Sequence, residues 1–125
     1  MHLQTLRPSV PYDIGDITLY KNGMATFRSD IIKRFNLENR DVLLVIDSDD
    51  KENNFIYLSI DESGNDANSF KVIKKKTGSF QKSLGRLSTI FCTNGIKKIT
   101  FFYSRKIING NKPYFVFAKN KIEKI

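Results

Sequence analysis

Apolar and polar residues alternate over short stretches in the first half of the chain. Residues 17–20 and 24–27 alternate in this way, which is typical of strands with one buried face. The Asn-Gly pair between them favours the positive φ angles of a tight hairpin turn. Residues 42–46 and 55–60 are two more apolar stretches of strand length, separated by a polar loop. The pattern therefore predicts two pairs of strands.

A short helix is predicted between the two pairs of strands. The apolar positions of residues 31–35 share one face at helical spacing, and Ser29 or Asp30 is the expected N-cap. Asn36 suits the left-handed residue that ends such a helix, and Leu37 is expected to fold back on its apolar face. The first half therefore has the predicted order β-β-α-β-β.

The order of elements starts again after a polar segment. Residues 61–69 are rich in Gly, Asn, Asp and Ser, a composition typical of a linker. Beyond it, residues 70–73 predict a strand, and apolar positions spaced over residues 82–91 predict a second helix. Residues 96–103 and 114–118 predict two strands joined by a loop. The second half is therefore also expected to be β-β-α-β-β.

These elements predict one compact domain over residues 1–125. The chain is long enough for one hydrophobic core and too short for a multidomain enzyme. Residues 16–60 and 70–118 contain the two similar units, which are either an internal repeat or a coincidence of spacing. The expected fold class is mainly β (β+α), built from β-β-α-β-β units with two short helices.

The charge is distributed unequally between the two halves. The chain has 21 Lys and Arg against 13 Asp and Glu, a net charge of +8. Residues 1–62 hold 7 basic and 11 acidic residues, a net of −4, and residues 63–125 hold 14 and 2, a net of +12. A surface of this charge attracts a polyanion, and nucleic acid is the commonest one in the cytosol. The alternative is a surface that serves solubility alone.

Basic residues near the turns and the second helix are the candidate DNA contacts. Two of them, Lys82 and Arg86, are spaced to share one face of the predicted helix. The expectation is that these side chains gather on one surface. The candidates in the second half are Lys74, Lys75, Lys76, Lys82, Arg86, Lys97 and Lys98.

Aromatic residues interleave with lysines in the same half. Of the 15 aromatic residues, most are expected in the core, because about half the side chains of an alternating strand point inward. Phe102 and Tyr114 are the candidates for exposed rings that stack on bases.

Residues 23–50, with the sequence GMATFRSDIIKRFNLENRDVLLVIDSDD, resemble the AbrB-like swapped-hairpin family, which includes SpoVT-type regulators and MazE-type antitoxins. The resemblance implies that two β-β-α-β-β units interlock their hairpins into one barrel that binds duplex DNA. The two units would belong to a homodimer or to one chain that forms a pseudo-dimer. Where the family often has basic residues, this chain has Met24, Ile32 and Lys33, so only Lys33 keeps a charge that the resemblance assigns to DNA binding.

Other chemistry is weakly represented. An acidic cluster in the loop after residue 46 lacks the glycine and ligand spacing of an EF-hand. His2 is the only histidine, and Cys92 is the only cysteine, without a histidine to activate it. There is no glycine-rich phosphate loop. We therefore expect no enzyme activity, no metal and no cofactor.

The sequence predicts a cytoplasmic protein with no membrane partner, because it shows no secretory signal and no apolar run of membrane-spanning length. The favoured function is a transcriptional regulator that binds duplex DNA through its basic second half. One alternative is a single-stranded nucleic-acid binder of Whirly-like or OB-like type. Another is an antitoxin-like module whose acidic half binds a basic protein.

Overall fold

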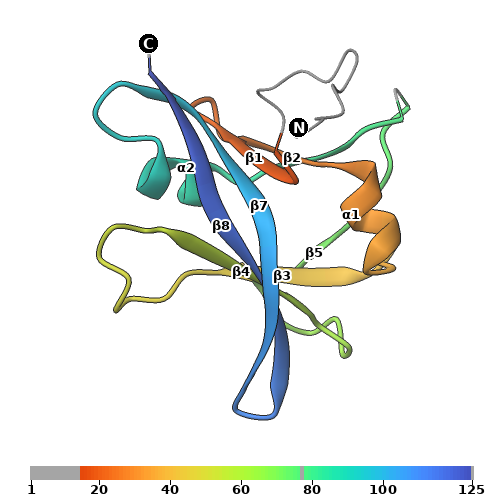
Figure 1. Ribbon diagram of the computed structural model, residues 1–125. Helices are drawn as coiled ribbons and strands as arrows, with labels where there is room; N and C mark the ends of the chain where they lie inside the picture. Colours follow the sequence, from red (N-terminus) through yellow and green to blue (C-terminus); the bar gives the residue numbers. More distant parts are fainter. Residues whose placement is uncertain (1–14, 77, 125) are drawn as a thin grey trace, which may run out of the picture.

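The computed structural model describes residues 15–76 and 78–124, and only the backbone of residue 86. Eight strands and two short helices make up this part of the chain (Figure 1). In chain order they are β1 (Ile17–Tyr20), β2 (Met24–Phe27), α1 (Ser29–Arg34), β3 (Asp41–Val45), β4 (Phe55–Ile60), β5 (Phe70–Lys71), β6 (Phe80–Ser83), α2 (Gly85–Phe91), β7 (Ile96–Asn109) and β8 (Lys112–Lys124).

The strands form one antiparallel sheet in the order β5-β3-β4-β8-β7-β1-β2-β6. The sheet curls into a half-barrel, with α1 and α2 on different sides of the view in Figure 1. The predicted fold class is therefore confirmed. Among the described residues, no helix is long and apolar enough to cross a membrane.

The strand pairing repeats itself between the two halves of the chain. The equivalent strands of the two halves are β1 and β5, β2 and β6, β3 and β7, and β4 and β8. Exchanging each strand for its equivalent converts the pair β3·β4 into β7·β8 and β1·β7 into β5·β3, and it leaves β2·β6 and β4·β8 unchanged. The counterpart of β1·β2 is a single bridge between Lys74 and Phe80 of β6. Each half therefore contributes strands that pair with the other half, and the seam of the half-barrel lies between β5 and β6.

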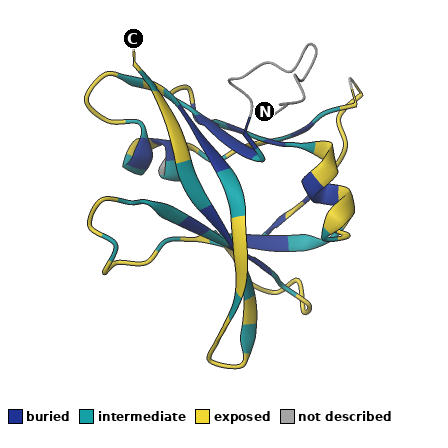
Figure 2. Cartoon of the chain, in the orientation of Figure 1, coloured by how far each residue is buried: buried dark blue, intermediate teal, exposed yellow. Residues whose placement is uncertain are grey.

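The concave face of the sheet holds the core (Figure 2). Fully buried side chains come from both halves, because β1, β4, β7 and β8 all turn their inner positions toward the same space. Phe101 has no exposed surface and meets Phe91 of α2 edge to face, with the ring centroids 5.3 Å apart. Ile31 and Ile32 of α1 close the core from the other side.

The start of α1 differs from the prediction, and its end agrees with it. Arg28 occupies the N-cap, so neither Ser29 nor Asp30 does, and no side-chain cap bond occurs among the described residues. Asn36 adopts the left-handed conformation with φ 53°. Leu37 is fully buried, and its N–H donates to the Ile32 carbonyl.

The second helix begins later than the sequence predicts. Residues 80–83 form β6 instead, because Phe80 is buried opposite Phe27 in the pairing of β6 with β2. The Leu84 N–H also donates to the Gly23 carbonyl at 2.6 Å. Lys82 is therefore a strand residue, and the expectation that it shares a helix face with Arg86 is wrong.

The last two strands are longer than predicted, with 14 and 13 residues. They meet in a two-residue turn, in which Gly110 and Asn111 have φ 60° and 65°. A β-bulge at Ser104 lies between the paired residues Tyr103 and Arg105. Residues 107–114 of the hairpin project past Phe115, the last residue of β8 that pairs with β4 (Figure 1), and Arg105 and Lys106 lie at the base of this projection. We call residues 105–114 the arm.

The two faces of β7 allow a stability test. Phe101→Ala should lower the free energy of unfolding by about 3–5 kcal/mol, because a fully buried ring leaves a cavity. Phe102→Ala is the matched control, since this ring is only half-buried on the opposite face. Its loss should cost clearly less. Urea denaturation measures both variants, and equal losses would contradict the placement of the core.

Candidate nucleic-acid interface

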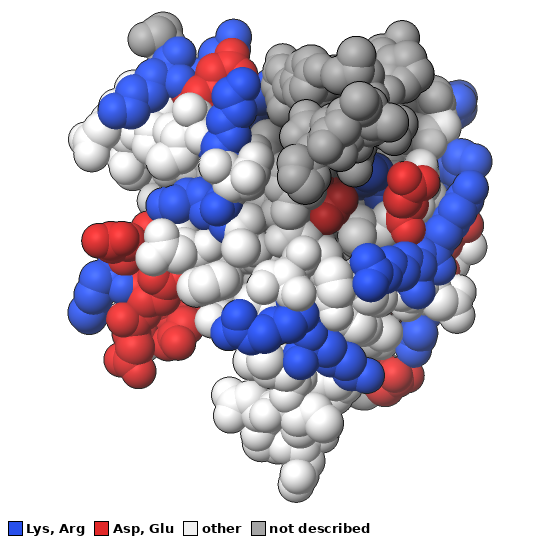
Figure 3. Space-filling model, in the orientation of Figure 1, with Lys and Arg blue, Asp and Glu red and all other residues white. Residues whose placement is uncertain are grey.

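The predicted cations are distributed over several elements. Lys33 lies exposed on α1, and Lys82 lies exposed on β6. Lys74, Lys75 and Lys76 are exposed in the connection between β5 and β6, and residue 86 is the second residue of α2. Figure 3 shows Lys and Arg in separate groups over this face, with the largest acidic group at the left edge and other acidic residues beside the basic groups.

Lys97 and Lys98 share one carboxylate at the start of β7. The two ammonium groups lie 3.5 and 3.3 Å from the carboxylate oxygens of Glu123 on β8. Hydrogen bonding and attraction from Lys98, and then from Lys97, hold the pKa of Glu123 below its ordinary value of 4.5. Lys98 also lies 5.9 Å from the centre of the Tyr20 ring, and its side chain is only 12% exposed. Glu123 therefore reduces the positive charge that these two lysines present.

The β1–β2 turn adds a cation that the sequence analysis missed. The Lys21 N–H donates to the Lys97 carbonyl at 3.0 Å, which places this exposed lysine beside the start of β7. A Cβ on Gly23 would lie 3.3 Å from Gly85 at the start of α2. The turn therefore joins Lys21, Lys97 and the N-terminal end of α2 in one region.

The arm carries three further cations that the sequence analysis left out. Arg105 and Lys106 are exposed and Lys112 is half-exposed. Each lies over an aromatic ring, at 5.7 Å from Phe55, 5.9 Å from Phe115 and 5.8 Å from Tyr114 respectively. The available signal was the run of residues 67–122, which holds 13 basic residues and no acidic one.

An aromatic cluster anchors the base of the arm to α1. Phe35 stacks on Phe115 with the ring centroids 4.1 Å apart, and it meets Tyr103 at 4.8 Å. The Arg34 guanidinium lies 4.8 Å from the centre of the Tyr103 ring. Because Lys106 lies over Phe115, the last turn of α1 and the base of the arm present their cations around the same cluster.

The two predicted stacking rings lie on one face of the sheet, opposite the core. In the strand register, Phe55 and Phe102 both pair with Ala118, and Tyr57 and Arg105 both pair with Val116. Tyr114 lies two residues before Val116, so it shares this face, and its ring meets Tyr57 edge to face at 6.5 Å.

Both rings are half-buried and have a cation beside them. The Arg28 guanidinium lies 5.8 Å from the centre of the Phe102 ring, and Lys112 lies at the same distance from Tyr114. A base that stacked on either ring would compete with these contacts. The neighbouring Tyr57 has a raised pKa because it is partly buried and because Asp47 and Asp50 are close.

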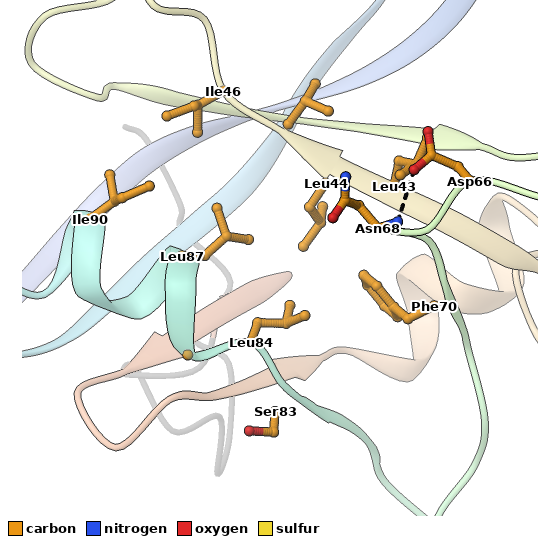
Figure 4. A pocket seen from close by; sticks show the side chains of 12 residues that line it. Leu43, Leu44, Ile46, Asp66, Asn68, Phe70, Ser83, Leu84, Leu87 and Ile90 are labelled. Carbon is orange, nitrogen blue, oxygen red and sulfur yellow. Dashed lines mark hydrogen bonds between the residues drawn. The ribbon is translucent and has the colours of Figure 1, made fainter.

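A cleft of about 570 Å³ separates α2 from β3 (Figure 4). Leu84, Leu87 and Ile90 point into it from one side, and Leu44 and Ile46 from the other. Asp66 and Asn68 lie at its loop side, where the Asn68 N–H donates to the Asp66 carboxylate at 2.8 Å. At α1, Phe35 instead stacks directly on Phe115 of β8, with the ring centroids 4.1 Å apart.

The acidic loop between β3 and β4 uses carboxylates to hold its own backbone. Asp47 accepts from the Asp49 N–H at 2.9 Å, and Asp50 accepts from the Phe55 N–H at 3.0 Å. Over residues 15–76 and 78–124, no group of three or more His, Cys, Asp or Glu side chains is placed to hold a metal ion. Burial raises the pKa of the Cys92 thiol, and His2 lies outside the described residues.

Comparison with protein-family models, with curated proteins and with solved structures finds no match for this chain.

Glu123→Gln should strengthen binding to a polyanion near neutral pH, because it removes the negative charge beside Lys97 and Lys98. At neutral pH the same substitution should also lower the free energy of unfolding. A carboxylate whose folded pKa is depressed stabilises the protein above its unfolded pKa, and this contribution is lost as pH falls through the folded value. The stability difference between the variant and the natural protein should therefore shrink below the ordinary value of 4.5. Thermal melts over a pH series measure it.

A difference that stays constant through the acid range would contradict the ion pairs. Glu62→Gln is the control, since Glu62 is 80% exposed and pairs with Arg40 of the acidic half. This variant should leave polyanion binding nearly unchanged.

Proposed function

We propose that this protein binds duplex DNA through the basic surface of its second half, with the arm as the main contact. The observation that carries the proposal is the arm itself. Its residues 107–114 project from the sheet (Figure 1), and its ten residues include three cations, two of them at its base, and no carboxylate. A two-stranded ribbon fits a groove of B-DNA, and Lys and Arg beside it can bind the phosphates on either side.

The packing at the base of the arm supports this role. Phe35, Tyr103 and Phe115 hold the ribbon against α1 through ring contacts. Cation–π contacts further limit the positions of Arg105, Lys106 and Lys112. A ribbon held in this way loses less conformational freedom on binding than a free loop would.

Cations elsewhere would extend the contact along the DNA. Lys33 and Arg34 lie on the α1 turn next to the base of the arm. Lys21, Lys97 and Lys98 form a second group at the β1–β2 turn, and Lys74, Lys75 and Lys76 form a third in the β5–β6 connection. We expect the phosphate contacts of these groups to contribute less to DNA affinity than those of the arm.

The biological role we propose is that of a cytoplasmic transcriptional regulator, as the resemblance to the AbrB-like family implies. The strand exchange between the two halves of this chain supports a single-chain pseudo-dimer as the binding unit, with a homodimer as the alternative. Sedimentation distinguishes them, because the chain mass is 14.4 kDa.

One observation favours a second function, single-stranded nucleic-acid binding. Phe55, Tyr57, Phe102 and Tyr114 share the face of the sheet opposite the core, with Arg105 among them. Removal of a ring that stacks on a base typically costs about 1–3 kcal/mol of binding. Competition between single strands and duplex separates the two functions, and the Phe102→Ala and Tyr114→Ala variants test the rings.

The charge of the arm can be tested through the salt dependence of binding. Changing Arg105, Lys106 and Lys112 to Ala should lower the slope of log K against log salt by about 0.9 for each lost phosphate contact. Affinity for mixed-sequence duplex should fall with it. Fluorescence anisotropy over a salt series measures both.

The matched control changes Lys74, Lys75 and Lys76 to Ala. Both variants lose three charges, but Figure 1 places the β5–β6 connection far from the arm. We expect the control to lose less of the slope. Equal losses would mean that net charge governs binding, which would remove the arm from the proposal. An unchanged slope in both variants would contradict DNA binding by this surface.

A further inference from the structure

The end of the arm presents two apolar side chains to solvent. Ile108 is 74% exposed, the highest exposure of any large hydrophobic residue in the described part of the chain. Pro113 is also exposed, and it pairs with Ile108 across the ribbon. The two residues therefore lie side by side on one face of the tip, one on each strand.

A lysine lies on the same ribbon face as this apolar pair, whereas Asp47 of the β3–β4 loop lies at the opposite face, where it lines a cavity with Ile107, Asn109 and Tyr114. Lys106 lies two residues before Ile108 and so projects on the same face of the ribbon, and Lys112 directly precedes Pro113. The nearest acidic residue along β8 is Glu123, at the other end of that strand. The turn itself has two residues, one of them Gly110, so the tip is narrow.

We propose that Ile108 and Pro113 form a wedge that enters the minor groove of duplex DNA, separates two stacked base pairs and kinks the helix. This inference rests on the proposed function and adds its preferred target, a duplex that is easily bent or already interrupted. Proteins that bend DNA from the minor groove insert Ile, Pro and similar side chains between base steps while cations hold the backbone.

Charge complementarity favours DNA over a second copy of this chain as the occupant of the tip. An exposed apolar pair can also be a contact between identical proteins. Two arms in contact would bring Lys106 and Lys112 of both copies together without a carboxylate on either arm, which is unfavourable. A polyanion removes this repulsion.

The wedge also explains how a protein with few base-reading side chains could discriminate between duplexes. Unstacking one base step costs a few kcal/mol, and the cost is lower at flexible or interrupted steps. The arm offers Asn109 and Asn111 as the polar side chains next to the turn. The preference would therefore follow mainly the deformability of the DNA.

The test uses the full chain and a short duplex with a donor and an acceptor dye at its two ends. Binding of the natural protein should shorten the end-to-end distance and raise energy transfer. It should also favour a duplex with a central nick over the intact duplex by about tenfold, because the nick lowers the cost of unstacking. Ile108→Ser should abolish both effects and leave the salt slope unchanged, because the cations remain.

The matched control is Ile122→Ser on β8, which changes the same residue type at 41% exposure away from the tip. It should bend DNA like the natural protein, and thermal melts check that both variants fold. Pro113→Ala should show a partial loss of the rise in energy transfer.

Four results would overturn the wedge. The natural protein could bind duplex without raising energy transfer, which leaves the proposed function intact. Ile108→Ser could still bend the DNA, or it could convert a dimer into a monomer in sedimentation without DNA. Absence of duplex binding by the natural protein would overturn the wedge and the proposed function together.

Discussion

The antiparallel pairing of β7 with β8 holds the whole sheet together. On one side β8 pairs with β4, which continues to β3 and β5; on the other, β7 pairs with β1, which continues to β2 and β6. Without this hairpin the sheet would fall into two three-stranded pieces, each with an exposed edge. Both three-stranded parts of the sheet therefore depend on the last 29 described residues, 96–124. The same hairpin extends past the sheet as the arm, so the element that joins the core also supplies the proposed contact with DNA.

Much of the first half follows from local signals in the sequence. The strands β1, β2 and β4 have their predicted limits, and Asn36 and Leu37 end α1 as expected, because turns and alternating strands are encoded by neighbouring residues. The second half depends more on distant partners. Residues 82 and 83 begin the predicted helix 82–91, but pairing with β2 makes residues 80–83 a strand. The length of β7 and β8 was also not predictable from local signals. Residues of a two-stranded ribbon face solvent on both sides, so the arm shows only a weak alternation of apolar and polar residues.

The sequence predicts that the candidate site is positively charged, but it shows much less about which residues form it. Charge counting locates the positive half of the chain, but it does not show which lysines have carboxylate neighbours. Glu123 is distant in sequence from Lys97 and Lys98 and adjacent to both in the sheet. Arg105 and Lys106 lie at the base of the projecting hairpin and Lys112 lies on it, and only the register of β4 and β7 on β8 shows these positions. Phe102 and Tyr114 lie on the face opposite the core, because strand side chains alternate, but both rings are half-buried and not exposed as predicted.

The bulge at Ser104 fixes which way every later side chain of the arm points. It sets two residues of β7 against one of β8, so Arg105 and Ile107 follow Phe102 on one side of the ribbon, and Lys106 and Ile108 follow Tyr103 on the other. If Ser104 instead paired as a regular strand residue, this assignment would be inverted, because side chains alternate with a period of two. Ile108 would then point away from Phe115 and from the α1 cations. The bulge at this serine, which has neither charge nor ring, thus determines the face on which each arm side chain lies. Insertions or deletions beside it would disturb DNA binding by the arm more than substitutions of the serine itself.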